Sequence, residues 1–235
     1  MENILMKYMG QRFQQTEKAK VVTEPGPVVT ISRLTGCPAK RIARKLSLKL
    51  NDELERFAGN VKWRCVSKEI LSEAAKELNL PDKQIDYVFN FEERSTWDDI
   101  MSSLSTKYYK SDRKIRKTIA DIIRAIAVQG NAIIIGRGSV VIVHDIPKSL
   151  HINFEAPLVW RAEMLSQRKG VSVTEAKKIA IETDLKRERF RNSFYGKNTD
   201  YTTFDVTYNC MTLTDVEIVE SIYKLMILKK LITVK

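Results

Sequence analysis

Three short segments of the sequence combine arginines with glycines or a carboxylate in patterns that suit phosphate binding. They are the loop at residues 32–46 (SRLTGCPAKRIARKL), the triplet Gly136-Arg137-Gly138, and the trio Asp184, Arg187 and Arg191. A guanidinium can bind a phosphate through two parallel hydrogen bonds, and glycine lets the backbone approach a ligand closely. The chemistry that these residue types indicate is recognition of phosphate groups, and none of them is predicted to ligate a metal ion.

The loop at residues 32–46 follows a short apolar run and precedes residues with helical apolar spacing. A loop between a strand and a helix can aim backbone N–H groups and the helix N-terminus at phosphates. The side chains and amides predicted to contact phosphate are those of Arg33, Gly36, Cys37, Lys40 and Arg41. The alternative is that Pro38 begins a helix and that the basic residues after it form a solvated face.

This loop departs from the phosphate-binding pattern G-x-x-x-x-G-K-[ST]. The pattern's glycines allow close approach, its Lys neutralises phosphates, and its hydroxyl coordinates Mg²⁺. Here these four positions hold Arg33, Pro38, Ala39 and Lys40. Pro38 also lacks the N–H that could face a phosphate. The loop is therefore degenerate, and its sequence leaves phosphate binding and its loss equally open.

Arg137 follows an apolar run at residues 132–136 that is typical of a strand buried on both faces. Its guanidinium is then expected in the crevice at the carboxyl ends of the strands, where parallel sheets bind ligands. The alternative is an ion pair with a carboxylate at the strand end.

Residues 158–197 hold ten Lys or Arg against five Asp or Glu. Asp184, Arg187 and Arg191 stand at i, i+3 and i+7 and so share one face of a predicted helix. Arg161 is a further candidate, one helix earlier. Since phosphoryl transfer needs mainly positioning and neutralisation of charge, such arginines can carry much of it. The alternative is a solvated helix laced with ion pairs.

Hydrophobic patterns predict the elements that position these residues. Strands are expected at residues 28–32, 132–136, 149–154 and 204–209, and helices around residues 42–50, 67–78, 115–126, 157–167, 172–194 and 216–231. Strands separated by helices indicate an α/β fold with a parallel, doubly wound sheet of about five strands. Pro25-Gly26-Pro27 predicts a boundary between an extension at residues 1–27 and one domain at residues 28–235.

Composition excludes several classes of protein. The chain is 43% hydrophobic and 29% charged, has no apolar run of the ~18 residues that span a membrane, and shows no signal peptide, so we expect a cytoplasmic protein. Three cysteines without CxxC spacing indicate reduced thiols. The net charge of +11 favours polyanions, but basic and aromatic residues do not alternate as in single-strand binders, so nucleic acid is not the expected partner.

Five stretches, read in order, resemble the cytidylate-kinase-like family of P-loop nucleoside-monophosphate kinases. They are the loop at residues 32–46, SKEILSEAAKELNLP at 67–81, NAIIIGRGS at 131–139, HDIPKSLHINFEAPLVWR at 144–161 and VTEAKKIAIETDLKRERFR at 173–191. The resemblance spans residues 28–230, and the segments 52–62 and 92–113 match poorly.

The resemblance implies a P-loop NTPase-like fold and transfer of the γ-phosphoryl group of Mg²⁺-ATP to a CMP-like acceptor. It implies that ATP binds at the first loop with Arg33, that Arg137 holds the acceptor, and that residues 158–197 form a lid. Arg161 with Asp184, Arg187 and Arg191 would close over ATP from that lid. Because the loop is degenerate, a second hypothesis is a catalytically impaired nucleotide-binding or regulatory protein on the same fold.

Overall fold

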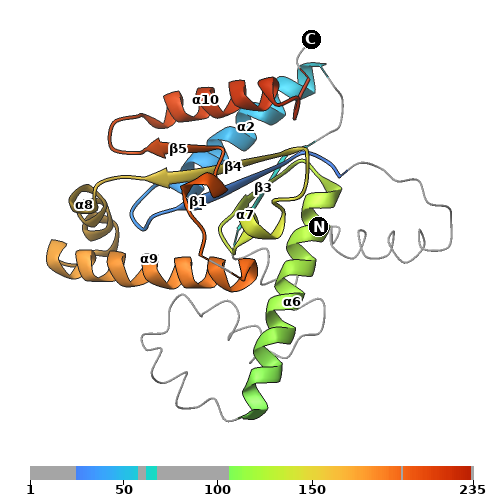
Figure 1. Ribbon diagram of the computed structural model, residues 1–235. Coiled ribbons are helices and arrows are strands. Elements are labelled where there is room, and N and C mark those ends of the chain that lie inside the picture. The colour runs from blue at the N-terminus through green and yellow to red at the C-terminus, as the bar shows by residue number, and fades with distance from the viewer. Residues whose placement is uncertain (1–24, 58–61, 68–105, 197, 234–235) are drawn as a thin grey trace, which may run out of the picture.

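A single parallel sheet organises the chain in the computed structural model, which describes residues 25–57, 62–67, 106–196 and 198–233. Five strands in these residues lie in the order β2-β3-β1-β4-β5 (Figure 1). They are β1 (Val28–Arg33), β2 (Arg64–Val66), β3 (Ala132–Ile135), β4 (Ser149–Glu155) and β5 (Val206–Asn209). The predicted α/β fold with a parallel sheet of about five strands is confirmed.

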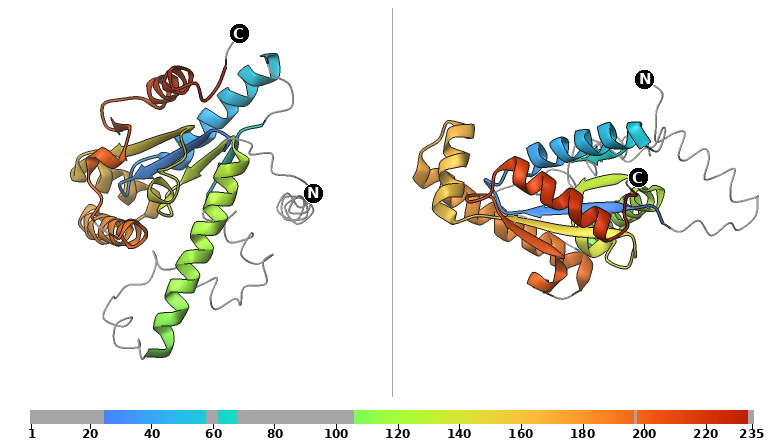
Figure 2. Two further views of the ribbon diagram at one scale, coloured as in Figure 1. Left: turned by 45° about the vertical axis from the view of Figure 1, so that its right-hand side comes forward. Right: turned by 90° about the horizontal axis from the view of Figure 1, so that it is seen from above.

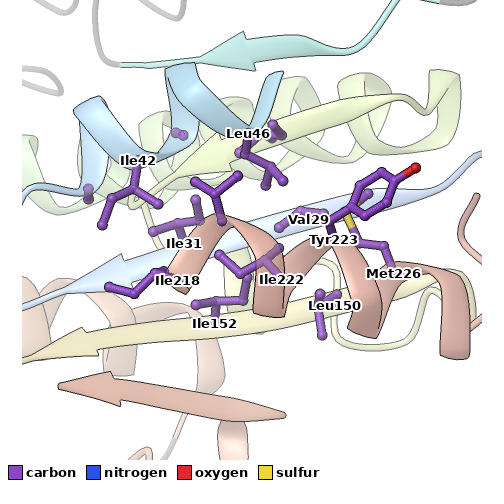
Figure 3. Close-up of a cluster of buried hydrophobic side chains, with 14 of the residues drawn as sticks. Val29, Ile31, Ile42, Leu46, Leu150, Ile152, Ile218, Ile222, Tyr223 and Met226 are labelled. Atoms are coloured by element: carbon purple, nitrogen blue, oxygen red, sulfur yellow. The ribbon is translucent and has the colours of Figure 1, made fainter. Parts of the chain in front are cut away.

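Helices α2 (Ala39–Phe57) and α10 (Asp215–Leu228) cover one face of the sheet. Figure 3 shows the core between them, in which Ile31 and Ile152 of neighbouring strands meet Ile42 and Ile222 of the two helices. All four side chains are fully buried. Burial of each such side chain stabilises the fold by about 1.5–3 kcal/mol, so this core anchors the strand ends that carry the site.

Helices α6 (Thr106–Gln129) and α7 (Ser139–Ile142) cover the opposite face. In β3, Ile133 and Ile135 belong to the core beside α2, whereas Ala132 and Ile134 pack with Ile123 of α6. Successive side chains of a strand point to opposite faces. The uninterrupted apolar run therefore marks a strand buried on both faces, as the sequence predicts.

Helices α8 (Leu158–Lys169) and α9 (Val173–Tyr195) form a hairpin at the carboxyl ends of the strands, which we call the lid hairpin (Figures 1 and 2). Gly170, at φ +70°, ends α8, and the Ser172 side chain accepts a hydrogen bond from the Glu175 N–H at the start of α9. The two helices pack through small and branched side chains, including Ala162, Leu165 and Ala180. None of the helices in the described residues is long and apolar enough to cross a membrane.

Some elements differ from the sequence-based expectation. Strand β2 was not predicted, because three residues are too few to display a strand pattern. Helix α6 begins at Thr106, inside a polar stretch without helical periodicity, and α10 ends at Leu228 rather than at Leu231. The helix predicted at residues 67–78 and nearly all of the extension at residues 1–27 lie outside the described residues.

Candidate functional site

The three phosphate-binding segments of the sequence meet at the carboxyl ends of β1 and β3. Arg33 is the last residue of β1, Arg137 follows β3, and α9 of the lid hairpin brings Arg187 and Arg191 to the same place. These four arginines, the arginine cluster below, line one small hollow of about 30 Å³, and none of its described lining residues is acidic. Four arginines from three separate segments of the chain thus line one hollow.

The Gly136-Arg137-Gly138 turn holds Arg137 beneath α9. All three residues have left-handed backbones, with φ of 71°, 60° and 67°. A Cβ atom at Gly136 would collide with the Arg33 guanidinium, and one at Gly138 would lie 2.8 Å from the Phe194 ring. Positive φ favours glycine at both positions and the Phe194 ring adds close approach at Gly138, whereas the Arg33 guanidinium is the mobile end of a side chain; Arg137 adopts a conformation that costs an L-residue about 1–2 kcal/mol. Its side chain is only 4% exposed, so the turn fixes a buried guanidinium.

Arg191 bridges the arginine cluster to a larger cleft. Its Nε donates to the Thr199 hydroxyl at 2.6 Å, and its guanidinium lies 5.6 Å from the centre of the Phe204 ring. Burial lowers the pKa of Arg191 and the nearby Glu188 opposes this effect. A guanidinium with reduced hydration gains more from an anionic partner than an exposed one does.

The larger cleft, of about 460 Å³, lies between α9, the end of β4 and the short helix η1 (Tyr201–Thr203). It shares Arg33, Arg187 and Arg191 with the arginine cluster, and its other walls include Asn153, Glu155, Tyr201 and Phe204. Sequence reasoning missed these four residues. For Asn153 and Glu155 a signal was present in the sequence of β4, where His151, Asn153 and Glu155 alternate with apolar residues and so mark a polar face of the strand.

The loop after β1 is bound to the lid hairpin through Thr35. Its N–H donates to Asp184 Oδ1 at 2.7 Å, its carbonyl accepts from Arg161 Nη1 at 3.0 Å, and its hydroxyl accepts from Arg187 Nη1 at 3.0 Å. Arg161 Nη1 also donates to Asp184 Oδ2 at 2.7 Å. The structure therefore brings together four of the predicted site elements: the loop, Arg161, Asp184 and Arg187.

Gly36 allows this close contact between loop and lid hairpin. Its φ is +103°, and a Cβ atom there would lie 2.6 Å from the carbonyl oxygen of Arg161. Arg161, at 7% exposed, is held further by a bond from its Nε to the Ala156 carbonyl at 2.8 Å. The loop and the first turns of α8 thus touch backbone to backbone.

The sequence profile of the cytidylate kinase-like family matches residues 28–211. The chain belongs to this family. No curated protein shows significant similarity to it. The family match extends from β1 through β5 and includes every residue of the arginine cluster and of the Thr35 contacts.

One solved structure shares the fold of this chain. A crystal structure of an uncharacterized protein from Eubacterium ventriosum is similar with a TM-score of 0.53 at 18% identity, over 85% of this chain and 97% of that one. TT1252 from Thermus thermophilus covers 90% of this chain and all of its own, with a TM-score of 0.41 and 14% identity. The first shows a shared fold, and the second is too distant to add to this.

Three residues predicted to contact phosphate lie apart from the arginine cluster in this family member. Arg41 forms an ion pair with Asp215 of α10 at 2.6 Å, and Lys40 is exposed on the first turn of α2. Cys37 is buried, and a hydrogen bond with Cys210 together with burial raises the pKa of its thiol. For these three residues a role in phosphate binding stays a prediction.

The loop as folded engages part of the backbone that would bind the phosphates of ATP, which the family resemblance implies as the donor. Four backbone N–H groups of this segment are already bonded within the protein: Leu34 to Phe154, Thr35 to Asp184, Cys37 to Leu34 and Ala39 to Cys37. Pro38 has no N–H to offer. For Mg²⁺, the position of the usual hydroxyl ligand holds Lys40, whose ammonium repels a cation.

Proposed function

We propose that the protein binds a nucleoside monophosphate, with the phosphate at the arginine cluster and the nucleoside in the adjoining cleft. The observation that carries this proposal is the convergence of four arginines from β1, the β3 turn and α9 on one hollow. A phosphate dianion is recognised by such guanidinium groups through charge-assisted, bidentate hydrogen bonds.

The shape of the surroundings supports a mononucleotide as the ligand. The cleft of about 460 Å³ is in the range of small-molecule sites, and its walls combine aromatic side chains with polar ones. Tyr201, at 84% exposed, and Phe204 offer ring faces for a base, while Asn153 and Glu155 offer hydrogen-bonding groups. Because the arginines are shared between hollow and cleft, one ligand can occupy both.

Calorimetry with the purified full chain and a panel of nucleoside monophosphates tests this proposal. Arg191→Gln keeps much of the side-chain volume but removes the charge at the boundary of hollow and cleft, and we expect at least tenfold weaker binding. Arg44→Gln is the matched control, because Arg44 is exposed on α2 and lines neither cavity. Absence of binding by every nucleotide at millimolar concentration, or equal affinity of both variants, would refute the proposal.

Phosphoryl transfer to the bound mononucleotide is a second candidate function. It is favoured by membership of the cytidylate kinase-like family and by the two lid arginines, Arg161 and Arg187, that reach the loop. Phosphoryl transfer would require the loop after β1 to open, since four backbone N–H groups of this segment are bonded within the protein. A coupled assay for ADP release, with Mg²⁺-ATP and each monophosphate including CMP, tests it, and turnover at background level would leave nucleotide binding as the function.

A further inference from the structure

The carboxylate of Asp184 is bound by a backbone amide of the loop after β1 and by Arg161 of the lid hairpin. One of its oxygens accepts the Thr35 N–H at 2.7 Å, and the other accepts from Arg161 Nη1 at 2.7 Å. Arg187 Nη1 stands 3.9 Å from the first oxygen. A backbone amide ahead of a helix and two guanidinium groups are the donors that protein sites use for a phosphate.

From this geometry we propose that Asp184 is an internal anion that fills an oxyanion-binding site formed by Thr35, Arg161 and Arg187. A phosphate group entering from the cleft competes with the carboxylate for these donors. While Asp184 occupies these donors, the loop cannot offer them to the phosphates of a nucleoside triphosphate, because the chain supplies its own competing anion. The lid hairpin must release Asp184 before the loop can hold an external anion.

The surroundings of Asp184 allow this exchange. Asp184, Arg161 and Arg187 all line the cleft of about 460 Å³, so a ligand in the cleft has access to the three side chains. The Asp184 side chain is 15% exposed, which leaves it a path toward water. With the carboxylate withdrawn, Arg161 and Arg187 carry two positive charges, which match the two negative charges of a phosphate near neutral pH.

A purely structural role for Asp184 makes the opposite prediction. A buried carboxylate that only ties the lid hairpin to the loop would, on removal, weaken the fold and leave phosphate binding unchanged or weaker. An internal competitor would, on removal, weaken the fold in the absence of phosphate and strengthen phosphate binding. The two roles are therefore separated by the sign of the change in affinity.

The test uses the full chain, inorganic phosphate as the probe, and Asp184→Asn. Titration followed by calorimetry and by thermal melting should show at least tenfold tighter phosphate binding by the variant than by the unaltered protein. Asp145→Asn is the matched control, because it removes the same charge from an exposed ion pair with Arg124 outside the cleft. Its phosphate affinity should equal that of the unaltered protein. Equal or weaker binding by Asp184→Asn would overturn the proposal.

A second measurement needs no variant and covers the case in which Asp184→Asn fails to fold. In the unaltered protein, phosphate that displaces the carboxylate must change the acceptor of the Thr35 N–H, so the Thr35 amide resonance should shift and saturate during a phosphate titration. A Thr35 resonance that stays in place while resonances of the arginine cluster shift would reject the internal anion and still support the proposed nucleotide site. The failure of one proposal is thus distinguishable from the failure of the other.

Discussion

Thr35 and Asp184 are 149 residues apart in the sequence, yet the Thr35 amide nitrogen lies 2.7 Å from a carboxylate oxygen of Asp184. The bond joins the loop after β1 to α9, and Arg161 of α8 binds both residues. Loop and lid hairpin are therefore held together by a small, largely buried set of polar groups. The strength of these hydrogen bonds and of the ion pair between Arg161 and Asp184 determines how readily the loop becomes available to a ligand.

Replacing Arg161 by Met should lower the free energy of unfolding by about 3 kcal/mol or more, because removal of one partner leaves Asp184 and the Thr35 carbonyl without their buried donor. Urea denaturation followed by circular dichroism measures this loss. Arg41→Met is the control, since Arg41 pairs with Asp215 but its side chain is 65% exposed. The control should cost less than about 1 kcal/mol. Equal losses in the two variants would show that the Arg161 network adds no stability.

Gly36→Ala should separate the lid hairpin from the loop. The added methyl would lie 2.6 Å from the Arg161 carbonyl oxygen, and the backbone at φ +103° disfavours any residue with a Cβ atom. Gly196→Ala carries the backbone penalty without the steric one, because Gly196 has φ +73° and nothing within 4 Å of the added atom. That control should cost about 1 kcal/mol.

The difference in stability between the two glycine variants measures the contribution of the contact between the loop and α8. Thermal melting should place Gly36→Ala several degrees below Gly196→Ala, and limited proteolysis should cut the loop after β1 faster in Gly36→Ala. Similar melting temperatures would mean that the loop and α8 separate without cost.

The fold was predictable where side-chain pattern reports burial directly. The run at residues 132–135 is apolar throughout because both faces of β3 are covered, and Ser172 with Gly170 marks the turn between α8 and α9. Strand β2 was not predictable in this way, since pairing with β3 rather than its own pattern makes its three residues a strand.

The candidate site was predictable in its residue types and less so in its contacts. Helical spacing places Asp184, Arg187 and Arg191 on one face of α9, but it does not say which partner that face meets. Asp184 meets a backbone amide of the loop, while Arg191 meets Thr199 and Phe204 beyond the end of the same helix. These partners depend on how the lid hairpin packs against the sheet, and the sequence of α9 alone does not determine that packing.

Cys37 should react slowly with alkylating reagents despite its place in the loop. Its thiol is buried beside that of Cys210, and their hydrogen bond together with burial raises the pKa of Cys37, so the reactive thiolate is scarce at neutral pH. Mass spectrometry after timed treatment of the folded protein with iodoacetamide should find Cys65, which is only partly buried, modified before Cys37. In denaturant the two rates should converge. Faster labelling of Cys37 in the folded state would contradict this environment.

His151 should make the protein less stable in weak acid. Its ring lies inside the fold, 8% exposed, with Nδ1 at 2.8 Å from the Thr30 hydroxyl and Nε2 at 3.1 Å from the Ser149 hydroxyl. Burial lowers its pKa to about 4, while the Asp205 carboxylate opposes this and Lys229 and His144 reinforce it. Between that value and the usual 6.5, the unfolded chain binds a proton that the folded chain excludes.

The sign of the effect follows from this difference in proton binding. The stability that His151 contributes is complete above about pH 6.5 and is lost as the pH falls toward 4, by roughly 3 kcal/mol at the low end since one pKa unit corresponds to about 1.4 kcal/mol. His151→Gln loses the buried ring that bonds to the Thr30 and Ser149 hydroxyls, so it should be less stable than the unaltered protein at pH 7. Because it also lacks the titrating group, the gap should narrow by roughly that amount at pH 4. Urea denaturation of both proteins at pH 7, 5.5 and 4 measures the gap. A gap that is the same at all three values would show that His151 takes up its proton without cost in the folded state.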